Sequence, residues 1–129
     1  MTKKLKLEEL GRIDVETFKK TAKIPLVVIL DSVRSMHNVG AIFRTADAFL
    51  VEKIVLCGIT PQPPHREIHK AALGATESVD WIYEQDINVA IDNLKKENFQ
   101  IIGIEQTSSS QLITDFEINS EKKYALMLG

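Results

Sequence analysis

Five short apolar segments, separated by stretches with helical periodicity, constrain this chain more than any other feature of its sequence. The expected strands cover residues 26–30, 53–57, 79–83, 100–104 and 124–128. Several are continuous apolar runs, which are typical of parallel strands covered on both faces. Strands that alternate with helices favour a mostly parallel sheet with right-handed crossovers. The sequence therefore predicts an α/β fold in which helices flank a mostly parallel sheet.

Two amphipathic helices are expected between these strands. The first has an apolar stripe at helical spacing, formed by Val39, Ile42, Phe43, Ala46, Phe49 and Leu50. The second starts at the capping residue Asp86 and has the apolar face Ile87, Ala90, Ile91 and Leu94. Prolines crowd residues 61–64, so this segment and the following His65–His69 are predicted to be loop.

The chain of 129 residues is the length of a single domain. Residues 1–24 predict a short, basic helical arm, with Asp14 as its N-cap and Pro25 at its end. Residues 25–129 carry the alternating pattern and are assigned to the α/β domain. No internal repeat or second domain is evident.

Charge is distributed unevenly along the chain, although the net charge is only −2. Residues 1–25 hold seven Lys or Arg against four Asp or Glu, whereas residues 76–129 hold four against ten. A polyanion such as RNA would be attracted to the first part and repelled by the last.

The sequence lacks the apolar segments that are typical of membrane-spanning and secreted proteins. No apolar run approaches the roughly 20 residues that cross a bilayer, so no membrane partner is predicted. Charged residues follow the basic start at once, in place of the apolar segment of a signal peptide. Cys57 is the single cysteine and cannot form an internal disulfide, which fits a reducing compartment. We expect a cytoplasmic protein.

Several familiar chemistries are excluded by spacing. Gly40 stands alone after the first strand, so there is no dinucleotide fingerprint, and no P-loop occurs. His65 and His69 are four residues apart, but no third ligand is evident and the glutamate between them is misplaced for a zinc protease motif. We therefore predict no metal site. Cys57 ends an apolar strand and is interpreted as a small core residue.

Two polar residues attract attention because ligands bind outside the carboxyl ends of parallel strands. Asn38 and Arg44 follow the first strand, and Arg44 lies off the apolar stripe of its helix. Their simplest structural roles are a helix N-cap for Asn38 and a surface salt bridge for Arg44.

The full string around these residues resembles a known motif. Residues 30–40 (Leu-Asp-Ser-Val-Arg-Ser-Met-His-Asn-Val-Gly) and 43–49 (Phe-Arg-Thr-Ala-Asp-Ala-Phe) resemble the first motif of the SpoU/TrmH-like ribose methyltransferases, a branch of the SPOUT enzymes. Residues 70–75 (Lys-Ala-Ala-Leu-Gly-Ala) are similar to a Lys-x-x-x-Gly-Ala element of the same family. The similarity extends from about residue 26 to residue 129.

The resemblance implies an α/β-knot fold, a homodimer, S-adenosylmethionine as cofactor, and methylation of a ribose 2′-hydroxyl in tRNA or rRNA. It makes Arg44 the catalytic arginine and Asn38 its motif partner. The cofactor-binding residues that it implies are Ile104, Glu105, Gln106, Leu128 and Gly129.

Four basic residues are expected to contact RNA phosphates. Arg34, His37, Arg66 and Lys70 fall in the two segments predicted to form loops at the mouth of the sheet. Their alternative interpretation is ordinary loop polarity.

The sequence also departs from the family pattern. The second motif normally continues from the Gly129 position into Asn-Glu and a further glycine, and a third motif then supplies the knot-closing helix. With that knot segment missing, we expect residues 1–129 alone to bind S-adenosylmethionine poorly and not to catalyse transfer. Two other functions stay open: a non-catalytic RNA-binding or assembly module, and a small-molecule-binding α/β domain, which the acidic last third favours.

Overall fold

The computed structural model describes residues 2–5 and 13–129. One sheet of five strands has the order β3-β2-β1-β5-β4, and every neighbouring pair is parallel. The strands are β1 (Ile24–Asp31), β2 (Val51–Cys57), β3 (Trp81–Glu84), β4 (Phe99–Gly103) and β5 (Lys123–Leu128). The helices are α1 (Val15–Lys20), α2 (Met36–Ala48), α3 (Arg66–Ala72), α4 (Ala75–Ser78) and α5 (Ile87–Lys96), with a 3-10 turn η2 (Ile113–Asp115). The predicted fold class is confirmed.

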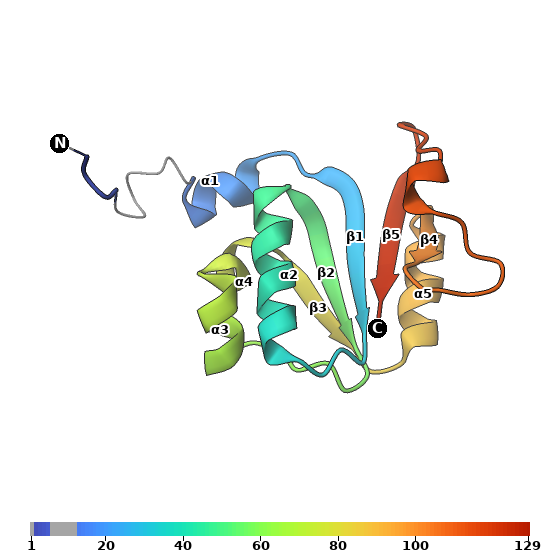
Figure 1. Ribbon diagram of the computed structural model, residues 1–129, viewed down its shortest axis with the longest axis horizontal. Helices are drawn as coiled ribbons and strands as arrows, with labels where there is room; N and C mark the ends of the chain where they lie inside the picture. Colours follow the sequence, from blue (N-terminus) through green and yellow to red (C-terminus); the bar gives the residue numbers. More distant parts are fainter. Residues whose placement is uncertain (1, 6–12) are drawn as a thin grey trace.

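Two apolar layers sandwich the sheet (Figure 1). Side chains alternate along β1, so Val28 and Leu30 join the cluster beneath α1 to α4, while Val27 and Ile29 join the cluster beneath α5. Burial of both faces explains why β1 reads as an unbroken apolar run.

The start of α2 corrects one expectation, because Ser35 and not Asn38 is its N-cap. The Ser35 Oγ accepts a hydrogen bond from the Asn38 backbone N–H at 3.1 Å. A capping side chain reaches the amide three residues further on, which places Asn38 inside the first turn. The Asn38 side chain is exposed there.

The end of α2 corrects a second expectation, because Phe49 is not part of the core. The helix ends at Ala48, and Leu50 adopts a left-handed φ of 57° that turns the chain into β2. Leu50 then packs against the core cluster, whereas Phe49 is 67% exposed. The periodic stripe therefore extends only to Ala46.

The segment predicted as loop after the prolines is instead helix α3. His65 is its N-cap, and the Nδ1 atom accepts a hydrogen bond from the Glu67 N–H at 3.2 Å. Because the prolines precede this cap, they remove no hydrogen bond from the helix. The prediction of loop at His65–His69 was therefore wrong.

Helices α2 and α3 make a close contact at Gly40. A Cβ atom built at Gly40 would collide with the carbonyl oxygen of Ile68 and would lie 2.7 Å from the Cβ of Ala71. Only glycine allows the two helix backbones to approach this closely.

Among the described residues of the predicted N-terminal arm, the helix is α1. Asp14 caps it as expected, accepting a hydrogen bond from the Thr17 N–H at 2.7 Å. The helix ends at Lys20, and Pro25 lies within β1, so Pro25 does not end the helix. Phe18 is 1% exposed and packs into the core.

Residues 1 and 6–12 of the predicted arm lie outside the described part of the chain. The division of the chain at residue 24 stays a prediction. Within the described residues, no helix is long and apolar enough to span a membrane.

Candidate functional site

The parallel strands all end at one edge of the sheet, and the five predicted cofactor-binding residues lie there. Ile104, Glu105 and Gln106 follow β4, Leu128 ends β5 and Gly129 follows it. Ile104 comes directly after β4, and its N–H donates a hydrogen bond to the Met127 carbonyl at 2.9 Å. Ile104 is 42% exposed, and Leu128 is partly buried against the core. The structure therefore brings the ends of β4 and β5 together, as the family resemblance requires.

The turn after β4 is organised by its own polar side chains. The Ser110 Oγ donates to the Glu105 carbonyl at 3.1 Å and accepts from the Thr107 N–H at 2.9 Å. The Gln106 N–H donates to the Glu105 carboxylate at 3.0 Å. Glu105 and Gln106 are exposed. Gly129, at the end of β5, approaches the Asp31 backbone so closely that a Cβ atom would collide with its carbonyl oxygen.

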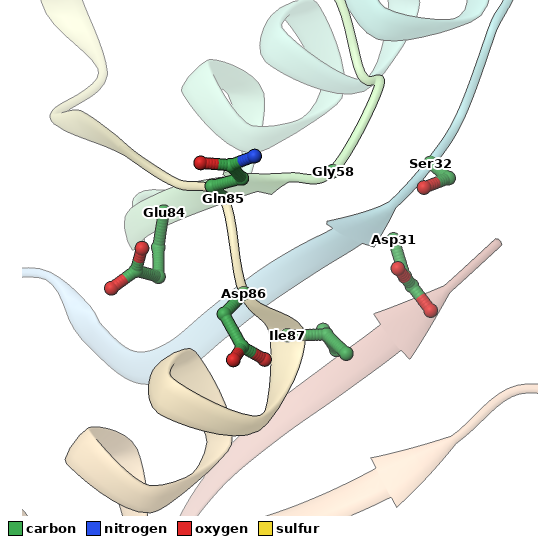
Figure 2. Close-up of a pocket in the computed structure, with 7 residues that line it drawn as sticks. All are labelled: Asp31, Ser32, Gly58, Glu84, Gln85, Asp86 and Ile87. Carbon is green, nitrogen blue, oxygen red and sulfur yellow. The ribbon is translucent and has the colours of Figure 1, made fainter.

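An acidic depression of about 590 Å³ lies at the same edge, beside β1 to β3 (Figure 2). Its lining residues are Asp31, Ser32, Gly58, Glu84, Gln85, Asp86 and Ile87. The Asp86 carboxylate is engaged as the α5 N-cap and accepts from the Asn88 N–H at 2.9 Å. Three carboxylates would repel a polyanion. Sequence reasoning missed this depression, although an acidic residue ends β1 and β3 alike.

Metal chemistry finds no support in the part of the chain that is described. It contains no group of three or more His, Cys, Asp or Glu side chains arranged to hold a metal ion. The two histidines flanking Glu67 serve structural roles: His65 caps α3, and the His69 Nδ1 lies 3.3 Å from the Thr76 hydroxyl.

Cys57 is a buried core residue, in agreement with its interpretation from the sequence. Burial, together with the negative charges of Asp31 and Glu84, raises the pKa of its thiol from 9.0 to about 11. The thiol is therefore neutral near pH 7 and a poor nucleophile.

We expect Cys57 to resist a water-soluble thiol reagent at pH 8 in the folded protein and to react fully in denaturant. Because the folded pKa lies above the unfolded one, the stability that this thiol contributes is present below pH 9 and is lost as pH rises towards 11. Labelling rates and unfolding free energies measured between pH 8 and pH 11, with Cys57→Ala as control, test both statements. Rapid labelling of the folded protein would contradict them.

Arg44 lies in a groove of about 530 Å³ between α2 and α3. The groove is lined by His37, Ala41, Arg44, Thr45, Ala48, Phe49, Lys70 and Ala71, and none of these is acidic. Lys70 forms an ion pair with Glu67 at 3.8 Å, with both side chains more than half exposed. Among the described residues, no carboxylate forms an ion pair with Arg44. The simple structural role considered for Arg44 is therefore not observed.

The predicted RNA-binding residues are distributed differently from the expectation. His37 lies on α2 and Lys70 on α3, and both line the groove beside Arg44. Arg66 is the first residue of α3 and is exposed. Only Arg34 lies in a loop, so the prediction that all four would lie in loops was wrong.

Asn38 and the predicted cofactor-binding residues do not line this groove. Figure 1 shows α3 on the side of α2 that faces away from β5. The polypeptide thus carries two separate candidate surfaces, the basic groove and the edge formed by β4 and β5.

Comparison with known protein families shows that residues 25–129 match the model of the SpoU rRNA Methylase family. The chain belongs to the SpoU rRNA methylase family. One relative of this SpoU-family chain is the 23S rRNA (guanosine-2′-O-)-methyltransferase RlmB of Coxiella burnetii. It is 30% identical over an alignment of 131 positions, which covers 95% of this chain and 49% of that protein.

Solved structures agree with this SpoU-family fold. A crystal structure of an rRNA methyltransferase from Sinorhizobium meliloti has 25% identity and a TM-score of 0.72, and the match covers 87% of this chain and 43% of that one. The AdoMet bound form has 24% identity and a TM-score of 0.73, covering 85% and 44%, and shows the fold alone. The chain spans about half the length of the curated relatives it matches.

Proposed function

We propose that this protein methylates a ribose 2′-hydroxyl of tRNA or rRNA, using S-adenosylmethionine. The observation that carries the proposal is the exposed Arg44 of the family motif, in a groove whose lining contains His37 and Lys70 and no carboxylate. A sugar–phosphate backbone is the polyanion that such a groove would attract.

The cofactor is proposed to bind at the edge formed by β4 and β5, against Ile104, Glu105, Gln106, Leu128 and Gly129. The residues present fit its chemistry. The exposed Ile104 side chain offers apolar contact to an adenine ring, and the Glu105 carboxylate is an acceptor for sugar hydroxyls. When bound, S-adenosylmethionine supplies an activated methyl group.

Arg44 is proposed to stabilise negative charge on the reacting 2′-oxygen. Its guanidinium stays protonated in proteins, so it cannot act as the general base. Two of its N–H groups can donate charge-assisted hydrogen bonds to the oxygen as the O–H bond breaks. Transfer would break the bond between the methyl carbon and the sulfonium sulfur and leave a neutral thioether, while the 2′-oxygen would take the methyl group and lose its proton to water or to an RNA phosphate. Asn38 is proposed to hold the ribose or Arg44 in register.

The function is tested by incubating the full-length protein with labelled S-adenosylmethionine and a mixture of tRNA and rRNA. We expect label in nucleosides whose 3′ linkage resists alkaline hydrolysis, because a methylated 2′-oxygen cannot attack the neighbouring phosphate. RNA binding with no methyl transfer would instead favour a non-catalytic RNA-binding or assembly module. The separation of the basic groove from the β4–β5 edge is the observation consistent with that second function.

RNA phosphates are proposed to contact Arg34, His37, Arg66 and Lys70. Arg66→Gln is expected to weaken RNA binding and to reduce the slope of log affinity against log salt by about one, because one phosphate contact is lost. Fluorescence anisotropy at several salt concentrations measures the slope, with Lys95→Gln on α5 as a matched control. An unchanged slope for Arg66→Gln would remove it from the interface.

We also propose that the active protein is a homodimer. A homodimer would place the groove of one protomer beside the β4–β5 edge of its partner, and sedimentation velocity tests whether the protein is a dimer.

Residues 1–129 cover about half of the curated relatives, so we propose that they bind S-adenosylmethionine weakly when isolated. Calorimetric titration of the 129-residue polypeptide measures this affinity. A cytoplasmic location is proposed because the proposed substrate is tRNA or rRNA.

A further inference from the structure

Phe49 is exposed where the sequence pattern placed it in the core. It is the C-cap of α2, and its side chain is 67% exposed because Leu50 occupies the place against the core cluster. A large aromatic side chain held at a helix end presents an apolar face to solvent, and a ligand that covered this face would bury its surface.

The surroundings of Phe49 indicate the chemistry of that partner. Phe49 lines the same groove as Arg44 and Lys70. Ala41, Ala48 and Ala71 also line it, and these short side chains leave space between the two helices. Glu67 forms an ion pair with Lys70 at 3.8 Å but is not among the residues that line the groove. An aromatic face next to cationic side chains is the combination that binds single-stranded nucleic acid.

We propose that Phe49 is a base-stacking residue that selects an unpaired nucleotide next to the ribose held at Arg44. This inference rests on the proposed function. Five residues separate Phe49 from Arg44 along α2, a rise of about 7.5 Å at 1.5 Å per residue. Phe49 and Lys70 both line the groove that contains Arg44. A base next to the ribose held at Arg44 can therefore reach the Phe49 ring while Lys70 contacts a flanking phosphate.

A paired RNA helix cannot make this contact. Its base faces are covered by neighbouring bases, whereas unpaired bases in loops and bulges can be splayed out onto an aromatic side chain. The stacking face accepts any base, so Phe49 selects the local conformation of the RNA and not its sequence.

The test compares the full-length wild-type protein with Phe49→Leu, which keeps apolar bulk but lacks the ring. The probes are a fluorescein-labelled single-stranded uridine dodecamer, the same backbone with abasic riboses, and an RNA duplex of equal length. We expect Phe49→Leu to weaken binding to the dodecamer about tenfold and to leave duplex binding unchanged. Leu112→Ala, which alters another exposed apolar residue at 70% exposure, serves as the control and is expected to bind as the wild type does.

The abasic probe isolates stacking from charge. It should bind wild type about as weakly as Phe49→Leu binds the dodecamer, and Phe49→Leu should lose nothing further on it. Equal affinities of wild type and Phe49→Leu for the dodecamer would overturn the stacking role, as would an equal loss on the duplex. Methyl transfer by the wild type is measured separately, so a failure of stacking leaves the proposed function standing. Absence of both RNA binding and methyl transfer would overturn the two together.

Discussion

Arg44→Lys is expected to lower the single-turnover rate of methyl transfer by about 100-fold in the full-length protein. Lysine keeps the positive charge but replaces a planar fork of donors by a single ammonium. Loss of one preorganised donor at a developing oxyanion typically costs about 100-fold to 1,000-fold in rate. RNA affinity should change little, because the charge in the groove is retained. Rapid-quench assays with excess enzyme, together with anisotropy titrations, separate the two effects.

The control for Arg44→Lys is the reverse exchange, from lysine to arginine, at a residue that does not line the groove. Lys95 is an exposed residue of α5, on the other face of the sheet, and Lys95→Arg should transfer methyl groups at the wild-type rate. If Arg44→Lys also matched the wild type, the stabilisation of the 2′-oxygen by a guanidinium fork would be refuted.

Gly40→Ala is expected to destabilise the fold by about 2 kcal/mol, within the range of overpacking substitutions. The added methyl group has to displace the α3 backbone at Ile68, because a carbonyl oxygen occupies its place. The displacement would also widen the groove that contains Arg44, so both stability and RNA affinity should fall. Urea unfolding followed by circular dichroism measures the change.

Gly103→Ala is the matched control for Gly40→Ala. A Cβ atom at Gly103 would meet only the Met127 Cε at 3.9 Å, an ordinary van der Waals contact. Its effect should stay within about 0.5 kcal/mol. Similar losses for the two variants would show that helix contact at Gly40 is not the cause.

Strands β1 and β2 could be predicted because each contains an apolar run whose two faces are both covered. β1 illustrates this, since Val27 to Leu30 are all buried and no other element of their length fits the pattern. The Asp14 and Asp86 caps could be predicted for a similarly local reason, because a short acidic side chain directly precedes each helical stretch.

Features that depend on competition between neighbours could not be predicted. Ser35 and Asn38 are both good capping residues, and only the position of the first turn decides between them. Phe49 fits the helical spacing of the apolar stripe. The helix ends at Ala48, however, and the left-handed φ of Leu50 turns the chain into β2. The prolines before α3 signal irregular structure without showing that a helix starts immediately after them.

The candidate site was predicted at the level of residues but not of their grouping. Arg44 was recognisable from its motif, yet its association with Lys70 depends on the close contact of α2 with α3 that Gly40 permits. The acidic depression depends on β3 lying at one edge of the sheet and on α5 starting beside it. Strand order is a property of the whole chain, so no local pattern indicates it.

Strand β1 is hydrogen-bonded to the next strand, β2, on one side and to the last strand, β5, on the other. During synthesis, β2 becomes available early, whereas the edge of β1 that faces β5 has no partner until residues 123–128 have left the ribosome. At about 5–20 residues per second, that open edge persists for several seconds. An unpaired apolar strand is a template for association with other chains. The central position of β1 therefore leaves an apolar strand edge open to association with other chains until β5 has been synthesised.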